Sequence, residues 1–215
     1  MISKPEFFVH IIESPSANDL LDGCTEGRSL GEIFTLAKIP HCYNLATNKE
    51  TFKYALLNRH KEAYNYYKKY PIRHLSLHGN QEGVGLTDKT FLSWAELQKL
   101  IAPLTNDMQG GLLICMSSCF GASGCRMAMY EGEDQPFWAL VGNKSEVSWK
   151  DAAIAYATFY HLWFKGFPVE ECVNRMKLAS DNFYFDLLSG HKVKSDWAEY
   201  MKNLRQEHLS QFYKW

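Results

Sequence analysis

The sequence predicts an α/β fold in which a mainly parallel, six-stranded sheet is covered by helices on both faces. Three observations support this prediction: short apolar runs alternate with longer amphipathic stretches, no repeat or low-complexity segment interrupts them, and one run is apolar enough for a sheet centre. With 215 residues and 46% hydrophobic content, the chain can build one large core. We therefore expect a single domain over residues 1–215.

The expected strands are short runs rich in branched and aromatic residues. In chain order they cover residues 7–12, 41–45, 72–77, 111–116, 137–141 and 183–188. The fourth run carries no charge at all. It is expected at the centre of the sheet, because a central parallel strand is buried on both faces.

The expected helices lie between these strands and begin or end at capping and breaking residues. Ser93 with Glu96 forms a capping box, Ser148 caps a long helix, and Pro103 is expected to end the helix that Ser93 begins. The expected helices cover residues 28–38, 49–69, 93–103, 148–165 and 168–178, with a further helix after Gly121 and a terminal one from Ser195.

The charge balance excludes several classes of partner. Twenty-three Lys and Arg residues nearly cancel 24 Asp and Glu residues, and no basic block is present, so nucleic acid is not expected as a partner. No apolar run approaches the roughly 20 residues that span a bilayer, so no membrane association is expected. The first residues lack the apolar segment of a secretory signal, which predicts a cytoplasmic protein.

The six cysteines are scattered along a chain large enough to need no disulfide framework, so reduced thiols are expected. Cys115, Cys119 and Cys125 lack the spacing of a structural zinc site, and no second cluster complements them. We therefore expect neither a metal nor a cofactor.

A histidine and a thiol follow two of the expected strands. His78 and Gly79 come directly after the strand over 72–77, and Cys119 follows the strand over 111–116. In an open α/β sheet, reactive residues lie just past the carboxyl ends of the strands. His78 and Cys119 are therefore expected to meet across one crevice.

These residue types suit nucleophilic catalysis. A thiolate attacks a carbonyl, and His78 can take the proton of Cys119, helped by the positive end of a helix beginning after Gly121. Gly79 lets its amide approach a substrate closely, so the amides of Gly79 and Cys119 are the expected donors to an oxyanion.

The two strand-end motifs resemble those of the caspase-like cysteine peptidases, the group that includes caspases, metacaspases and the bacterial CHAT proteases. The motifs are residues 74–79, ending in His78-Gly79, and residues 112–119, ending in Cys119, 41 positions apart where caspases have about 50. The resemblance implies a three-layer caspase-like fold and cysteine endopeptidase activity on a protein or peptide substrate. Residues 83–88 and 93–97 look most like the CHAT-type members, which often act as effectors in bacterial defence.

The resemblance also implies where substrate binds. Ser117 and Ser118 stand where true caspases have Gln-Ala, so specificity for aspartate does not carry over. The first loop and the segment before the helix at 148 are pocket walls in related enzymes, and their candidate substrate-binding residues here are Asp19, Asp22, Glu26, Arg28 and Trp149, together with Ser117.

Two questions stay open at the level of sequence. The acidic residues of the first loop suit a basic side chain before the scissile bond, whereas Arg28 suits an acidic one. The rival function is a catalytically silent module that binds a partner, which a blocked crevice would favour. An enzyme awaiting an activating partner protein or ligand would look similar. A serine hydrolase is disfavoured because no G-x-S-x-G elbow occurs.

Overall fold

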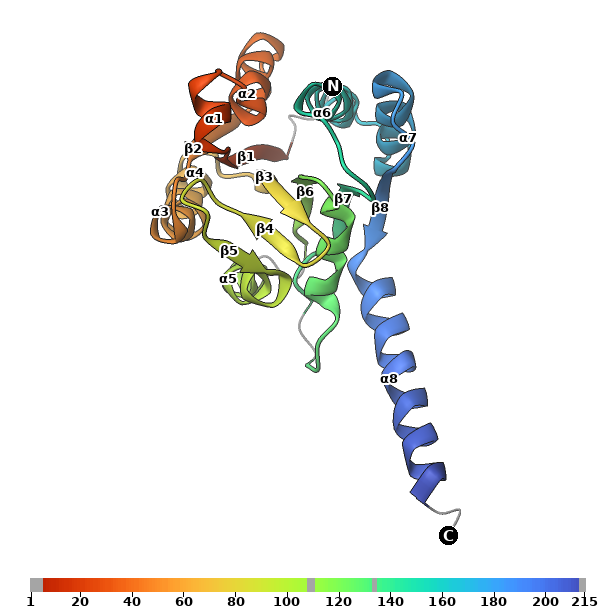
Figure 1. Cartoon of the computed structure of the whole chain (residues 1–215). Coiled ribbons are helices and arrows are strands. Elements are labelled where there is room, and N and C mark those ends of the chain that lie inside the picture. The colour runs from red at the N-terminus through yellow and green to blue at the C-terminus, as the bar shows by residue number, and fades with distance from the viewer. Residues whose placement is uncertain (1–5, 108–110, 133–134, 213–215) are drawn as a thin grey trace.

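The computed structural model describes residues 6–107, 111–132 and 135–212, which form an α/β fold around one mixed sheet (Figure 1). Six strands follow the order β2-β1-β3-β6-β7-β8, and the short strands β4 and β5 extend the sheet from β3. All neighbours on the six-strand path are parallel except β8, which runs antiparallel to β7. The strands are β1 (Phe7–Ser14), β2 (His41–Leu45), β3 (Tyr70–Asn80), β4 (Gly83–Gly85), β5 (Phe91–Ser93), β6 (Leu113–Ser117), β7 (Ala139–Asn143) and β8 (Phe185–Ser189).

The predicted mainly parallel sheet is confirmed, and its six main strands lie close to their expected positions. β3 is longer than expected, because it continues through His78 to Asn80 and turns back into the hairpin of β4 and β5. The central strand β6 is buried at every residue, as its apolar sequence predicts.

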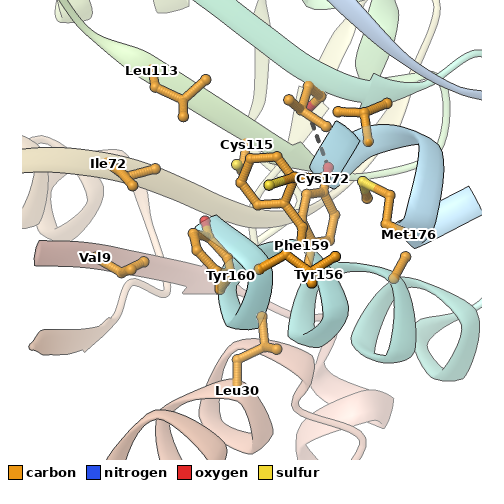
Figure 2. Close-up of a cluster of buried hydrophobic side chains, with 14 of the residues drawn as sticks. Val9, Leu30, Ile72, Leu113, Cys115, Tyr156, Phe159, Tyr160, Cys172 and Met176 are labelled. Carbon is orange, nitrogen blue, oxygen red and sulfur yellow. Dashed lines mark hydrogen bonds between the residues drawn. The ribbon is translucent and has the colours of Figure 1, made fainter. Parts of the chain in front are cut away.

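One face of the sheet is covered by α2 (Glu26–Ala37), α6 (Trp149–Trp163) and α7 (Val169–Ser180). Figure 2 shows Tyr156, Phe159 and Tyr160 of α6 packed over Ile72 and Cys115 of the central strands. Burying such a side chain contributes roughly 1.5–3 kcal/mol to folding. Tyr156 also donates its hydroxyl to the carbonyl of Val141 at 3.1 Å, so its one polar group is satisfied.

The other face is covered by helices that the sequence located less well. α3 (Lys49–Tyr54), a π-helical turn (Ala55–Arg59) and α4 (His60–Tyr67) replace the single helix expected over 49–69. α5 (Trp94–Asp107) and the 3₁₀ helix Gly121–Ala128 complete this layer.

Pro103 does not end its helix, contrary to the expectation from sequence, but lies inside α5. A proline in a helix loses one hydrogen bond and costs about 3 kcal/mol. Here Leu97, Ile101 and Leu104 on the same helix are buried in the core, and that burial outweighs the cost.

Two helices lie at the margins of the fold. The short α1 (Ala17–Leu21) forms within the expected first loop, and α8 (Gly190–Phe212) begins before the expected Ser195 and projects away from the body (Figure 1). Within the described residues, no helix combines the length and the hydrophobicity needed to cross a bilayer.

Candidate active site

His78 and Cys119 emerge from matched points of adjacent parallel strands. Ser76 of β3 pairs in register with Ser117 of β6, and each candidate lies two residues beyond that pair. A side chain at Gly79 would come within 2.8 Å of the Cys119 carbonyl oxygen. The two strand ends therefore lie side by side, and their close approach requires glycine at position 79.

His78 is held by a carboxylate and an indole. Its Nε2 lies 2.6 Å from Oδ2 of Asp19, and its ring stands edge-on to the ring of Trp149 with centroids 5.2 Å apart. Because Nε2–H donates to Asp19, the lone pair of the neutral ring lies on Nδ1. Nδ1 is therefore the ring nitrogen that can accept a proton, and the His78 side chain is 48% exposed.

Asp19 connects the first loop to this site. The Ser16 amide and hydroxyl both donate to its carboxylate, and Trp149 Nε1–H donates to Oδ1 at 3.3 Å. Burial opposes ionisation of Asp19, but the hydrogen bonds from Ser16 and His78 outweigh it and lower the pKa of its carboxyl. Asp19 is therefore an anion at neutral pH and fixes the orientation of the imidazole.

The Cys119 sulfur lies against the segment that leads into α6. Its Sγ accepts from the Val147 amide at 3.4 Å and lies 3.7 Å from the Val147 carbonyl oxygen. No hydrogen bond joins Sγ to His78 within the described residues. The two side chains contact the same short segment instead, because Val147 contacts the sulfur and Trp149 contacts the imidazole.

The turn after Cys119 is sharp. Phe120 adopts a left-handed conformation with φ of 54°, and its amide donates to the Ser145 carbonyl at 2.9 Å. A side chain at Gly121 would collide with the Met116 carbonyl oxygen, so glycine is needed there too. A non-glycine residue in this conformation costs roughly 1–3 kcal/mol, and such strain concentrates at functional sites.

A buried polar row forms below the two strand ends. Glu13, Ser76 and Ser117 are in register on β1, β3 and β6, and all three are essentially buried. Glu13 accepts from the Gly27 and Arg28 amides and from the Tyr43 hydroxyl. Burial nevertheless raises the pKa of Glu13, and the nearby Glu26 carboxylate adds to that effect.

Three polar atoms in this region lack partners. The Ser117 and Ser118 hydroxyls and Oε1 of Glu26 are buried and make no hydrogen bond with the described residues. Glu26 Oε2 binds Nε2 of the buried His74 at 3.2 Å. An unsatisfied buried polar group is costly, so such a set is typical of a site that another molecule completes.

The structure thus divides the substrate-binding candidates. Asp19 and Trp149 contact His78, Ser117 is buried within the polar row and Glu26 beside it, and Asp22 and Arg28 are exposed on the first loop and α2. The sequence reasoning missed Glu13 and Ser76. An acidic residue at the carboxyl end of the first apolar run was the one available signal for this row.

The described residues include no cluster of three or more His, Cys, Asp or Glu side chains suited to hold a metal ion. Comparison of the chain with models of known protein families finds no match. A search among curated proteins likewise finds none that is significantly similar in sequence.

Proposed function

We propose that this chain is a cysteine endopeptidase in which Cys119 is the nucleophile and His78 the general base. The observation that carries the proposal is the register of β3 and β6. It brings a thiol and an oriented, half-exposed imidazole to the same edge of the sheet, at the carboxyl ends of these two strands. The sheet order, the antiparallel β8 and the hairpin after β3 support a caspase-like fold.

The proposed reaction follows from the site. As the Cys119 proton moves to Nδ1 of His78, Sγ forms a bond to the carbonyl carbon of the scissile peptide. The imidazolium, stabilised by Asp19, then protonates the leaving amine as the peptide bond breaks. Water then attacks the thioester carbonyl carbon while His78 takes its proton, and His78 returns that proton to the Cys119 thiolate as the C–S bond breaks.

Two amides support the negative charge that develops on the substrate oxygen. Within the described residues the Cys119 amide has no acceptor, whereas those of Phe120 and Gly121 are bound to Ser145 and Ser118 carbonyls. A two-residue turn joins β3 to β4, and Gly79 pairs with Val84 one position before the pair that closes this turn. At such alternate positions of an antiparallel pair, the amide points away from the partner strand, so the Gly79 amide does not bind to β4. We therefore assign the Gly79 and Cys119 amides to the oxyanion.

The buried row favours a basic residue before the scissile bond. Glu13 and Glu26 place two carboxyl groups below the site, and the unpaired Ser117 hydroxyl and Glu26 oxygen are acceptors for a cationic side chain. The exposed Arg28 is the opposing signal, but an exposed charge acts weakly because water screens it.

The test is intact-mass analysis after exposure to peptidyl acyloxymethyl ketones that carry Arg, Leu or Asp before the reactive group. We expect one adduct, at Cys119, formed fastest with the Arg compound. Cys119→Ala abolishes it, whereas Cys24→Ala, which removes an exposed cysteine outside the site, leaves it unchanged. An adduct that persists in Cys119→Ala contradicts the proposal, and faster labelling by the Asp compound contradicts the specificity alone.

A second candidate is a catalytically silent binding module. It is favoured by one observation: His78 binds Asp19 of the first loop and the Cys119 sulfur binds Val147, so the two side chains are not joined to each other. Complete absence of labelling, in a protein whose Cys119 reacts with a small alkylating reagent, would favour this module or an enzyme that waits for an activating partner.

A further inference from the structure

A buried arginine without a counter-charge lies at the other end of the strand that carries His78. Arg73 of β3 has no exposed surface, and its guanidinium donates to Nδ1 of His10 and, at 3.1 Å, to Nδ1 of His60. Its Nε has no partner. No carboxylate forms an ion pair with it within the described residues. A buried cation left without an anion is strongly unfavourable.

The hydrogen bonds of Arg73 fix the tautomers of both imidazoles. Guanidinium nitrogens only donate, so each Nδ1 is an acceptor and each neutral ring carries its proton on Nε2. Burial, with the charge of Arg73, lowers the pKa of His60 to about 3 and holds that of His10 well below its usual range. Both rings are therefore neutral at physiological pH.

The two rings differ in what their Nε2–H groups meet. The Nε2–H of His10 donates to the side-chain oxygen of Asn44 at 2.9 Å. His60 Nε2–H has no acceptor in the described part of the chain, although Arg73 polarises it through the ring. One donor of an otherwise matched pair is thus left unused.

The unused donor belongs to a residue that lines a cavity of about 540 Å³, within the usual range for small-molecule sites. Lys61, which makes no ion pair with the described residues, and Asn65 are on the same wall, and Leu57, Pro103 and Leu104 supply apolar surface. Among the residues whose side chains the structure describes, no acidic one lines this cavity. The π-helical turn Ala55–Arg59 immediately precedes His60, and such turns occur frequently at functional sites.

We propose that this cavity binds a small organic anion, whose phosphate or carboxylate group accepts from His60 Nε2–H and the Lys61 ammonium while its apolar part packs on Leu57, Pro103 and Leu104. The positive charge of Arg73, which donates to Nδ1 of His60, strengthens His60 Nε2–H as a donor. The bound anion in turn gives Arg73 the negative charge that the fold does not provide. Arg73, which polarises His60, lies five residues before His78 on β3, about 16 Å along the strand at ~3.3 Å per residue, and His78 does not line this cavity. The site does not depend on the proposed peptidase chemistry, so Cys119→Ala retains it.

The test uses the two histidines as probe and internal control. Imidazole ¹⁵N–¹H spectra are recorded while phenyl phosphate, benzoate or inorganic phosphate is added at constant ionic strength. We expect a saturable shift of the His60 signals, with those of His10 little changed. Lys61→Met weakens binding about tenfold, as expected for a charge-assisted contact, whereas Lys53→Met on the exposed surface of α3 does not.

The probes also separate the classes of ligand. Tighter binding of phenyl phosphate or of benzoate identifies the preferred acidic group. Inorganic phosphate that binds as tightly as phenyl phosphate would contradict the apolar part of the proposal. A linear, non-saturating response, equal shifts at His10 and His60, or equal weakening by Lys53→Met and Lys61→Met would overturn the site altogether.

Discussion

β3 carries two histidine environments that differ in partner and burial. At its carboxyl end, His78 is half exposed and donates to the carboxylate of Asp19. Toward its amino end, Arg73 donates to His10 and His60, which are buried. A carboxylate partner leaves Nδ1 free as a base, whereas a buried guanidinium occupies Nδ1 and keeps the ring neutral. Partner charge and burial, rather than residue type, thus decide which imidazole can transfer a proton.

The largest effect on the labelling rate is expected when His78, and not His60, is replaced. Loss of a general base removes about 10²–10⁴-fold of rate, so His78→Ala should reduce the labelling rate at Cys119 by about a thousandfold. The matched variant His60→Phe should change that rate by less than about threefold, because the ring lies far from the reacting atoms. Equal losses in the two variants would show that His78 acts only through folding.

Acid should destabilise the protein through the buried rings. In the unfolded chain His60 binds a proton below about pH 6.5, whereas in the folded chain its pKa is about 3. Stability from this residue is therefore present above pH 6.5 and is lost as pH falls toward 3, by roughly 3 kcal/mol at pH 4.5.

Urea unfolding of wild type and His60→Phe at pH 7.5 and 4.5 measures this contribution. The variant is expected to be less stable at pH 7.5, since Arg73 loses an acceptor, but to lose less stability on acidification. Carboxyl groups titrate in both proteins, so their contribution cancels when the two losses of unfolding free energy are subtracted. Identical losses on acidification would show that His60 is not neutral in the folded protein.

A smaller effect is expected at Asp19. Asp19→Asn keeps a hydrogen-bond acceptor beside His78 but removes the charge that stabilises the imidazolium, so labelling should slow about tenfold. As a positioning residue, Asp19 should also alter the pH dependence of the rate: without its charge the general base is protonated less readily, so the acidic limb should move to lower pH. Asp22→Asn, at an exposed acidic residue of the same loop, is the control. An unchanged pH profile in Asp19→Asn would make its role purely structural.

The smallest effect concerns Trp149. Trp149→Phe retains an aromatic ring beside His78 but deletes the Nε1–H donor to Asp19. Removing one neutral donor costs about 1 kcal/mol at most for a partly exposed pair, so we expect a slowing of about threefold. Trp149→Ala should slow labelling further, because the imidazole also loses its packing partner. A Phe variant as slow as the Ala variant would assign the whole effect to the hydrogen bond.

Local sequence patterns predict the six main strands, because each is a short apolar run between capping or breaking residues, and they place His78 and Cys119 just after two of these strands. Residues over 41–45 form β2 with the expected bounds, and Ser148 caps α6 as predicted. Such signals are local, so they can be read without knowing what packs against them.

The remaining features depend on how distant segments pack together. Pro103 remains inside α5 because core burial outweighs a lost hydrogen bond, and Asp19 reaches His78 across 59 positions of sequence. The register of β1, β3 and β6 places Glu13, Ser76 and Ser117 in one row, and the fold buries Arg73 between two histidines. Packing and strand register join residues that are distant in the chain, and no local pattern records those contacts.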